Sequence, residues 1–165
     1  MFIFKTNSPE QTFEFGKKLA QLVTPGFVLC LQGNLGAGKT LFVQGLASGL
    51  DTSDSVTSPT FTLLNVYQAK LTIFHFDLYR LEHPDELQDI GFYEYTATDG
   101  VAVIEWPDKF SEQLPSERLW IEITPGESMS ERQIQIRAYG AKYQQVCEEL
   151  KNIADSCFRY GHPSV

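Results

Sequence analysis

The chain has 165 residues, and its 13 Lys and Arg against 21 Asp and Glu give a formal net charge of −8. Hydrophobic residues make up 42% and charged residues 21%, which excludes a disordered chain and indicates a globular protein large enough to form its own core. The acidic balance argues against a broad nucleic-acid-binding face, and no apolar run approaches the roughly 18 residues of a membrane span.

The first predicted element is a helix that begins after Ser8 and ends near Val23. Ser8 suits an N-cap, Pro9 suits the first helical position, and apolar residues then recur with helical spacing. The apolar run at residues 27–31 predicts a strand buried on both faces. Helical spacing returns over residues 40–50, so the chain is expected to open as helix, strand, loop and helix.

Strand patterns dominate the middle of the chain. Residues 61–67 and 71–76 are separated by a short polar break and predict a hairpin. Residues 101–104 are uniformly apolar and predict another buried strand, whereas residues 118–124 and 133–138 alternate apolar and polar side chains, as half-exposed strands do.

Helical patterns complete the chain. A short helix is expected to start at residues 83–87, and a closing helix is expected around residues 143–150. The alternation of strands and helices predicts an α/β protein, a three-layer sandwich whose mixed, largely central sheet is flanked by helices. We expect residues 1–155 to form a single domain and residues 156–165 to form a flexible C-terminal tail.

The most specific motif is GNLGAGKT at residues 33–40, which matches the phosphate-binding P-loop pattern at every fixed position. Gly36 and Gly38 allow backbone amides to turn toward a triphosphate. Lys39 brings a positive charge to the β and γ phosphates, and Thr40 offers a hydroxyl to Mg²⁺. A buried strand before the loop and a helix after it therefore predict a nucleotide site in a P-loop NTPase-like fold.

A second Mg²⁺ ligand is expected from a carboxylate at the end of a neighbouring strand. Asp77 and Glu105 both end apolar runs, and the more uniform run favours Glu105. Asp77 would then orient the attacking water or a switch segment. Thr60 is either a sensor of the γ-phosphate or an ordinary strand-entry threonine, and Trp106 is either a lid or a packing residue. His75 is expected to be a core residue.

Four sequence blocks in order resemble the TsaE family, the P-loop ATPases of bacterial tRNA threonylcarbamoyladenosine biosynthesis. They are GNLGAGKT at 33–40, SPTFTL at 58–63, HFDLYR at 75–80 and IEWP at 104–107. The resemblance runs from about residue 8 to residue 137. It implies a small, single-domain, Mg²⁺-dependent ATPase of weak intrinsic activity, which supports a heterodimer of TsaB and TsaD and meets tRNA only through that complex.

The resemblance also implies roles for individual residues. Thr40 and Glu105 match the Mg²⁺ ligands. The residues implied in turnover are Lys39, Asp77, Thr60 and Trp106. The residues implied in binding ATP are Leu35, Gly36, Ala37, Gly38, Lys39 and Thr40, with Arg132 near the nucleotide and Pro9 and Glu10 beside the adenine.

Two other functions stay open from the residues alone: a P-loop small-molecule kinase, and a nucleotide-gated binding module without essential hydrolysis. A kinase usually needs an arginine-bearing lid, and Arg80 is the only arginine before residue 118. The odd number of cysteines, 3, together with a start that lacks the features of a signal peptide, predicts reduced thiols in a cytoplasmic protein.

Overall fold

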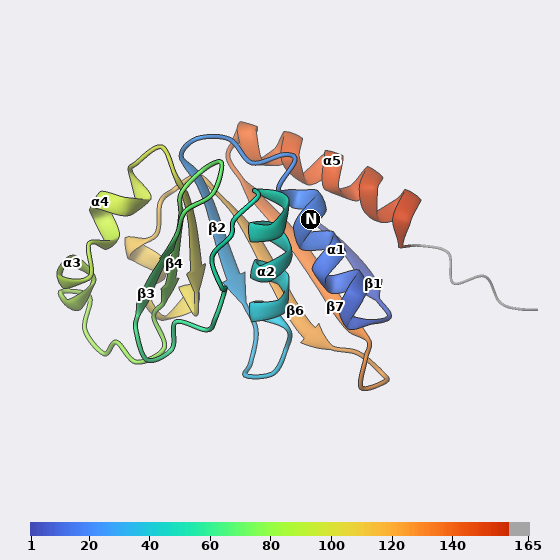
Figure 1. Ribbon diagram of the computed structural model, residues 1–165, viewed down its shortest axis with the longest axis horizontal. Coiled ribbons are helices and arrows are strands. Elements are labelled where there is room, and N and C mark those ends of the chain that lie inside the picture. The colour runs from blue at the N-terminus through green and yellow to red at the C-terminus, as the bar shows by residue number, and fades with distance from the viewer. Residues whose placement is uncertain (159–165) are drawn as a thin grey trace, which may run out of the picture.

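A mixed seven-stranded sheet in the order β1-β7-β6-β2-β5-β4-β3 runs through the protein (Figure 1). In the computed structural model, which describes residues 1–158, four adjacent strands at the centre are parallel. They are β6 (Arg118–Pro125), β2 (Phe27–Gln32), β5 (Val101–Glu105) and β4 (Ile73–Asp77). Their carboxyl ends therefore meet at one edge of the sheet, where ligands of α/β proteins bind.

Antiparallel strands complete the sheet on both sides. β7 (Arg132–Tyr139) pairs with β6 and with β1 (Phe2–Thr6), and β3 (Leu64–Tyr67) pairs with β4. The predicted β3–β4 hairpin is confirmed, although β3 starts at Leu64 because residues 59–63 form a tight turn closed by Leu63 N–H and Pro59 C=O at 2.7 Å.

Two helical layers of unequal size enclose the sheet (Figure 1). The larger layer consists of α1 (Pro9–Leu19), α2 (Lys39–Gly49) and α5 (Ala141–Cys157), whose apolar side chains join one core cluster with the facing strands. The opposite face is covered over β4 and β5 by α3 (Glu86–Asp89), α4 (Phe92–Thr96) and the 3₁₀ segment η1 (Pro107–Gln113). The predicted α/β sandwich with a mixed sheet is confirmed.

Several element bounds differ from the predictions for local reasons. Ser8 caps α1 as expected and accepts a hydrogen bond from Gln11 N–H at 3.2 Å. The helix ends at Leu19 instead of near Val23, because the following residues close i→i+3 turns before Pro25. Strand β1 was not predicted from the sequence, since its partner β7 lies about 130 residues later in the chain.

The predicted tail at residues 156–165 needs a correction at its start. α5 continues to Cys157, and the ring of Phe158 lies 5.9 Å from that of Phe15 and 6.1 Å from that of Phe4, measured between centroids. These aromatic contacts hold the end of α5 to the domain. Residues 159–165 of the predicted tail lie outside the described part of the chain. None of the helices in residues 1–158 has the length and apolar character needed to cross a bilayer.

Candidate nucleotide-binding site

The P-loop joins the end of central strand β2 to the start of α2. Gly36 and Gly38 have φ angles of 78° and 108°, a left-handed region that suits glycine and strains other residues. Gly38 is the N-cap of α2 and, having no side chain, offers no cap to the first amides of the helix. These amides and the positive end of the helix dipole are therefore available to an anion.

Lys39 is held at the base of this loop. Its side chain is buried, its Nζ donates a hydrogen bond to Gly33 C=O, and Nζ lies 3.8 Å from Glu105 Oε2. Nζ also lies 4.4 Å from the ring centroid of Trp106. Burial lowers the pKa of Lys39, and the carboxylates of Glu105 and Asp77 oppose that shift. The loop thus places a desolvated positive charge beside two acidic side chains.

The two predicted acidic residues end neighbouring strands and are register partners, Asp77 opposite Glu105. Both are buried. Asp77 accepts hydrogen bonds from Thr60 Oγ1 and from Tyr79 N–H, each at 2.9 Å. Glu105 Oε1 lies 2.9 Å from His75 Nε2. His75 is buried as expected of a core residue, but its contact with Glu105 was not foreseen, because it depends on the pairing of β4 with β5.

A cavity of about 270 Å³ opens in front of the loop. Nine of the predicted site residues line it, so segments far apart in the sequence meet at one place. Leu41 and Ser58 are the two lining residues that were not predicted. The full lining consists of Leu35, Gly36, Gly38, Lys39, Thr40, Leu41, Ser58, Thr60, Asp77, Glu105 and Trp106.

The predicted adenine neighbours Pro9 and Glu10 line an adjoining cavity of about 240 Å³. Phe13, Glu14 and Leu41 complete its wall, and Leu41 also lines the loop cavity. Phe13 and Leu41 offer apolar surface of the kind that contacts a nucleobase. Sequence reasoning missed Phe13, whose only signal was its position one helical turn after Pro9.

Arg132 lies against the P-loop and comes from the start of β7. Its Nε donates to Ala37 C=O at 2.8 Å, and Nη2 lies 3.4 Å from Gly36 C=O. Nη1 donates to Met129 and Glu131 C=O, each at 2.8 Å. In this structure the guanidinium therefore ties the loop to the β6–β7 turn, next to the place predicted for the nucleotide.

Trp106 follows Glu105 at the point where β5 turns into η1. Its φ of 56° is in the left-handed region, which is rare for a bulky residue and occurs mainly at functional or strained sites. The ring stands 4.8 Å from the Tyr79 ring between centroids and lines the loop cavity. The geometry thus combines packing against Tyr79 with access to the cavity.

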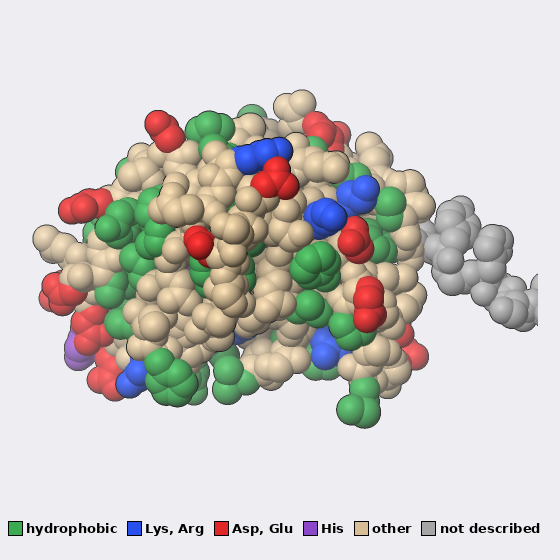
Figure 2. Space-filling model, viewed as in Figure 1, with side chains coloured by type: hydrophobic (Ala, Val, Ile, Leu, Met, Phe, Trp, Pro, Cys, Tyr) green, Lys and Arg blue, Asp and Glu red, His purple; other side chains and the backbone are tan. Residues whose placement is uncertain are grey.

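Exposed apolar side chains project from the loops at the same edge of the sheet. Leu35 is 74% exposed, Phe61 83% and Met129 97%. They belong to the P-loop, to the segment before β3 and to the β6–β7 turn respectively. Figure 2 shows apolar side chains projecting from the lower edge of the molecule, where these loops lie.

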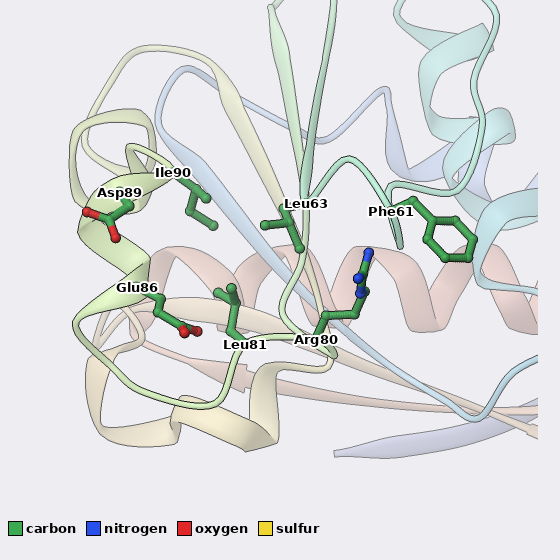
Figure 3. A pocket seen from close by; sticks show the side chains of 7 residues that line it. All are labelled: Phe61, Leu63, Arg80, Leu81, Glu86, Asp89 and Ile90. Carbon is green, nitrogen blue, oxygen red and sulfur yellow. The ribbon is translucent and has the colours of Figure 1, made fainter.

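A larger cavity of about 340 Å³ lies between the segment before β3 and helix α3 (Figure 3). The Arg80 guanidinium extends toward Phe61, 5.3 Å from the ring centroid. No residue of the P-loop lines this cavity, so the smaller loop cavity remains the candidate phosphate site. Its lining consists of Phe61, Leu63, Arg80, Leu81, Glu86, Asp89 and Ile90.

The loop cavity offers a small set of oxygen ligands for a cation. Residues 1–158 contain no group of three or more His, Cys, Asp or Glu side chains placed to hold a metal. Mg²⁺ in nucleotide sites is usually bound by one or two protein oxygens together with phosphates and water. The Thr40 hydroxyl and the Glu105 carboxylate, both lining the cavity, fit that limited role.

Comparisons with known proteins identify close relatives. A family model described as "Threonylcarbamoyl adenosine biosynthesis protein TsaE" matches residues 6–134. The tRNA threonylcarbamoyladenosine biosynthesis protein TsaE of Bacillus subtilis is 44% identical over 148 residues, covering 89% of this chain and 92% of the relative. The protein of the same name from Treponema pallidum is 46% identical over 110 residues, covering 67% and 82% respectively. The crystal structure of Bacillus subtilis YdiB superposes with a TM-score of 0.77 at 38% identity, covering 92% of this chain and 95% of that one.

Proposed function

Because the chain belongs to the TsaE family of tRNA threonylcarbamoyladenosine biosynthesis proteins, we propose that it acts in that process as a Mg²⁺-dependent ATPase. The observation that carries the proposal is the convergence of the P-loop, Thr60, Asp77 and Glu105 on one cavity. Membership in the TsaE family indicates the biological process, and the residues that line the cavity indicate the chemistry.

The residues that line the loop cavity have separate roles in nucleotide binding and hydrolysis. Loop amides and Lys39 bind the β and γ phosphates and stabilise the negative charge that develops on the γ-phosphoryl oxygens. Thr40 and Glu105 would hold the cation, which would neutralise phosphate charge when bound. Asp77 orients the attacking water, and its hydrogen bond with Thr60 fixes the carboxylate and links the site to the segment before β3.

The adjoining cavity supports adenine as the base. It lies along α1, directly across Leu41 from the phosphate cavity, and its wall includes the half-buried ring of Phe13. Because Leu41 lines both cavities, a base bound there would lie beside the P-loop cavity. Glu10 and Glu14 at the rim accept hydrogen bonds, which suits the exocyclic amine of adenine and disfavours the O6 carbonyl of guanine.

We also propose that a TsaB–TsaD heterodimer is the protein partner and that tRNA is met only through that complex. Support comes from the exposed Leu35 and Phe61 side chains beside the nucleotide cavity, since exposed apolar groups gathered on one edge favour protein contacts. The net charge of −8 does not favour binding of the isolated protein to the negatively charged phosphates of tRNA. Tight tRNA binding by the isolated protein at physiological salt would contradict this part of the proposal.

Nucleotide binding and ATP hydrolysis by the purified protein, alone and with TsaB–TsaD, test the function. Thr40→Ala and Glu105→Ala should each abolish the Mg²⁺-dependent hydrolysis, while Glu122→Ala serves as a matched control. Glu122 is also a strand carboxylate, but it pairs with Arg137 at 3.6 Å and does not line the cavity. Full activity of Glu105→Ala would indicate that Asp77, and not Glu105, is the carboxylate that binds the cation. Absence of ATP binding by the wild-type protein would refute the proposal.

A further inference from the structure

A buried histidine stands directly behind the carboxylate that lines the cavity. His75 is 0% exposed, and its Nε2 lies 2.9 Å from Glu105 Oε1. Residues two apart on a strand share a face, so His75 and Asp77 both point toward the layer that contains α1 and α2. His75 does not line the cavity, so the imidazole contacts Glu105 from outside the cavity lining.

The two oxygens of Glu105 have different neighbours. Oε1 contacts the imidazole, whereas Oε2 lies 3.8 Å from Lys39 Nζ. Since an ionised carboxylate only accepts hydrogen bonds, His75 Nε2–H is the donor to Oε1 when Glu105 is ionised. His75 Nδ1 is buried and has no hydrogen-bond partner within residues 1–158.

We propose that His75 is a positioning residue for Glu105: its Nε2–H holds Oε1 and leaves Oε2 directed toward the cation and phosphates. The inference rests on the proposed function, because it concerns the carboxylate assigned there as a Mg²⁺ ligand. Hydrogen-bond partners of metal ligands fix the orientation of the ligand, and their loss typically lowers metal affinity by about 10–100-fold.

An ordinary core histidine would behave differently. Ile73 is a matched residue, since it lies on the same strand and face and is 0% exposed, but it is not hydrogen-bonded to the site. Replacing a purely structural side chain lowers the stability of the fold but does not specifically reduce the gain in nucleotide affinity that Mg²⁺ provides. The ratio of nucleotide affinities with and without Mg²⁺ therefore separates positioning from packing.

The experiment compares wild type with His75→Leu, His75→Gln and Ile73→Ala as full-length proteins. The affinity for a non-hydrolysable ATP analogue is measured by calorimetry with Mg²⁺ and with EDTA, and thermal stability is recorded for each protein. His75→Leu should lose about 10–100-fold of the Mg²⁺-dependent gain in affinity and keep the metal-free affinity. His75→Gln, whose amide reaches about as far as Nε2, should recover most of the gain, and Ile73→Ala should lose stability only.

Each outcome decides the matter. If His75→Leu keeps the wild-type Mg²⁺ dependence, or if Ile73→Ala loses it equally, the inference is overturned while the proposed function stands. If the wild type binds the analogue without any Mg²⁺ dependence, the proposed metal site fails and the inference fails with it. If His75→Leu does not fold, His75→Asn replaces it: its shorter amide should lose the dependence that His75→Gln keeps, and equal behaviour of the two would refute the inference.

Discussion

The crossing of α1 and α2 offers the sharpest test of how the fold supports the site. Glycines stand where the two helices touch: a Cβ added at Gly45 would lie 2.0 Å from Phe13 C=O, and one added at Gly16 would lie 2.2 Å from Phe42 C=O. Ordinary carbon–oxygen contacts are about 3.3 Å or longer. A Gly45→Ala variant must therefore separate the helices locally by about 3.3 − 2.0 = 1.3 Å.

The energetic cost follows from two opposing terms. Alanine improves the helix propensity of this position by about 1 kcal/mol. Overpacking a close contact costs about 1–3 kcal/mol, and the upper value applies to Gly45 because a backbone carbonyl cannot rotate aside as a side chain can. The net destabilisation of Gly45→Ala is then about 2 kcal/mol. With an unfolding entropy of about 2.1 cal/mol/K per residue, this lowers the melting temperature by about 6 °C.

Thermal and urea unfolding measure this loss, and nucleotide titration measures its effect on the site. The local separation of α1 from α2 in Gly45→Ala should weaken nucleotide binding, because Phe13 on α1 and Leu41 on α2 line the same cavity. Ser48→Ala, at a half-buried position of α2, is the control and should change stability by less than about 0.5 kcal/mol. A Gly45→Ala protein as stable as wild type would refute the close crossing.

Two further predictions concern groups outside the site. The Tyr143 hydroxyl accepts the Val28 N–H at 2.8 Å in a buried position, so Tyr143→Phe should lose about 1–3 kcal/mol in urea unfolding. Burial raises the pKa of Tyr143 above its usual value of 10.0. The difference in unfolding free energy between wild type and Tyr143→Phe should therefore be complete below pH 10.0 and shrink as the pH rises through the folded-state pKa. Equal stability of the two proteins would exclude the hydrogen bond. Burial also raises the pKa of Cys30 to about 12 and raises that of Cys147, whereas Cys157 is exposed. A thiol reagent at pH 8 should modify Cys157 rapidly and the other two only on unfolding, and rapid reaction of Cys30 would contradict its burial.

Prediction of the fold succeeded where the signal is contained in a short segment. Ser8 and Pro9 marked the start of α1, and the apolar run at 27–31 marked the central strand, because capping and burial on both faces leave local patterns. Strand β1 gave no such pattern, since it gains its hydrogen bonds only from β7. The end of α5 was misplaced for a similar reason: Phe158 is held by Phe4 and Phe15, which lie far away in the sequence.

The candidate site shows the same division between local and distant determinants. The sequence by itself determined the P-loop, because strand, glycines, Lys39 and Thr40 are consecutive and their backbone geometry depends on nearby residues. Only the tertiary structure decided that Asp77 faces Glu105 across paired strands, that Arg132 binds the carbonyls of the loop and that His75 contacts Glu105. These contacts join residues 28 to 96 positions apart. The two contacts of Glu105 depend on the register of β4 against β5, and the contact of Arg132 depends on the place of β7 in the sheet. Strand order and register are set by the packing of both faces of the sheet and not by any one segment.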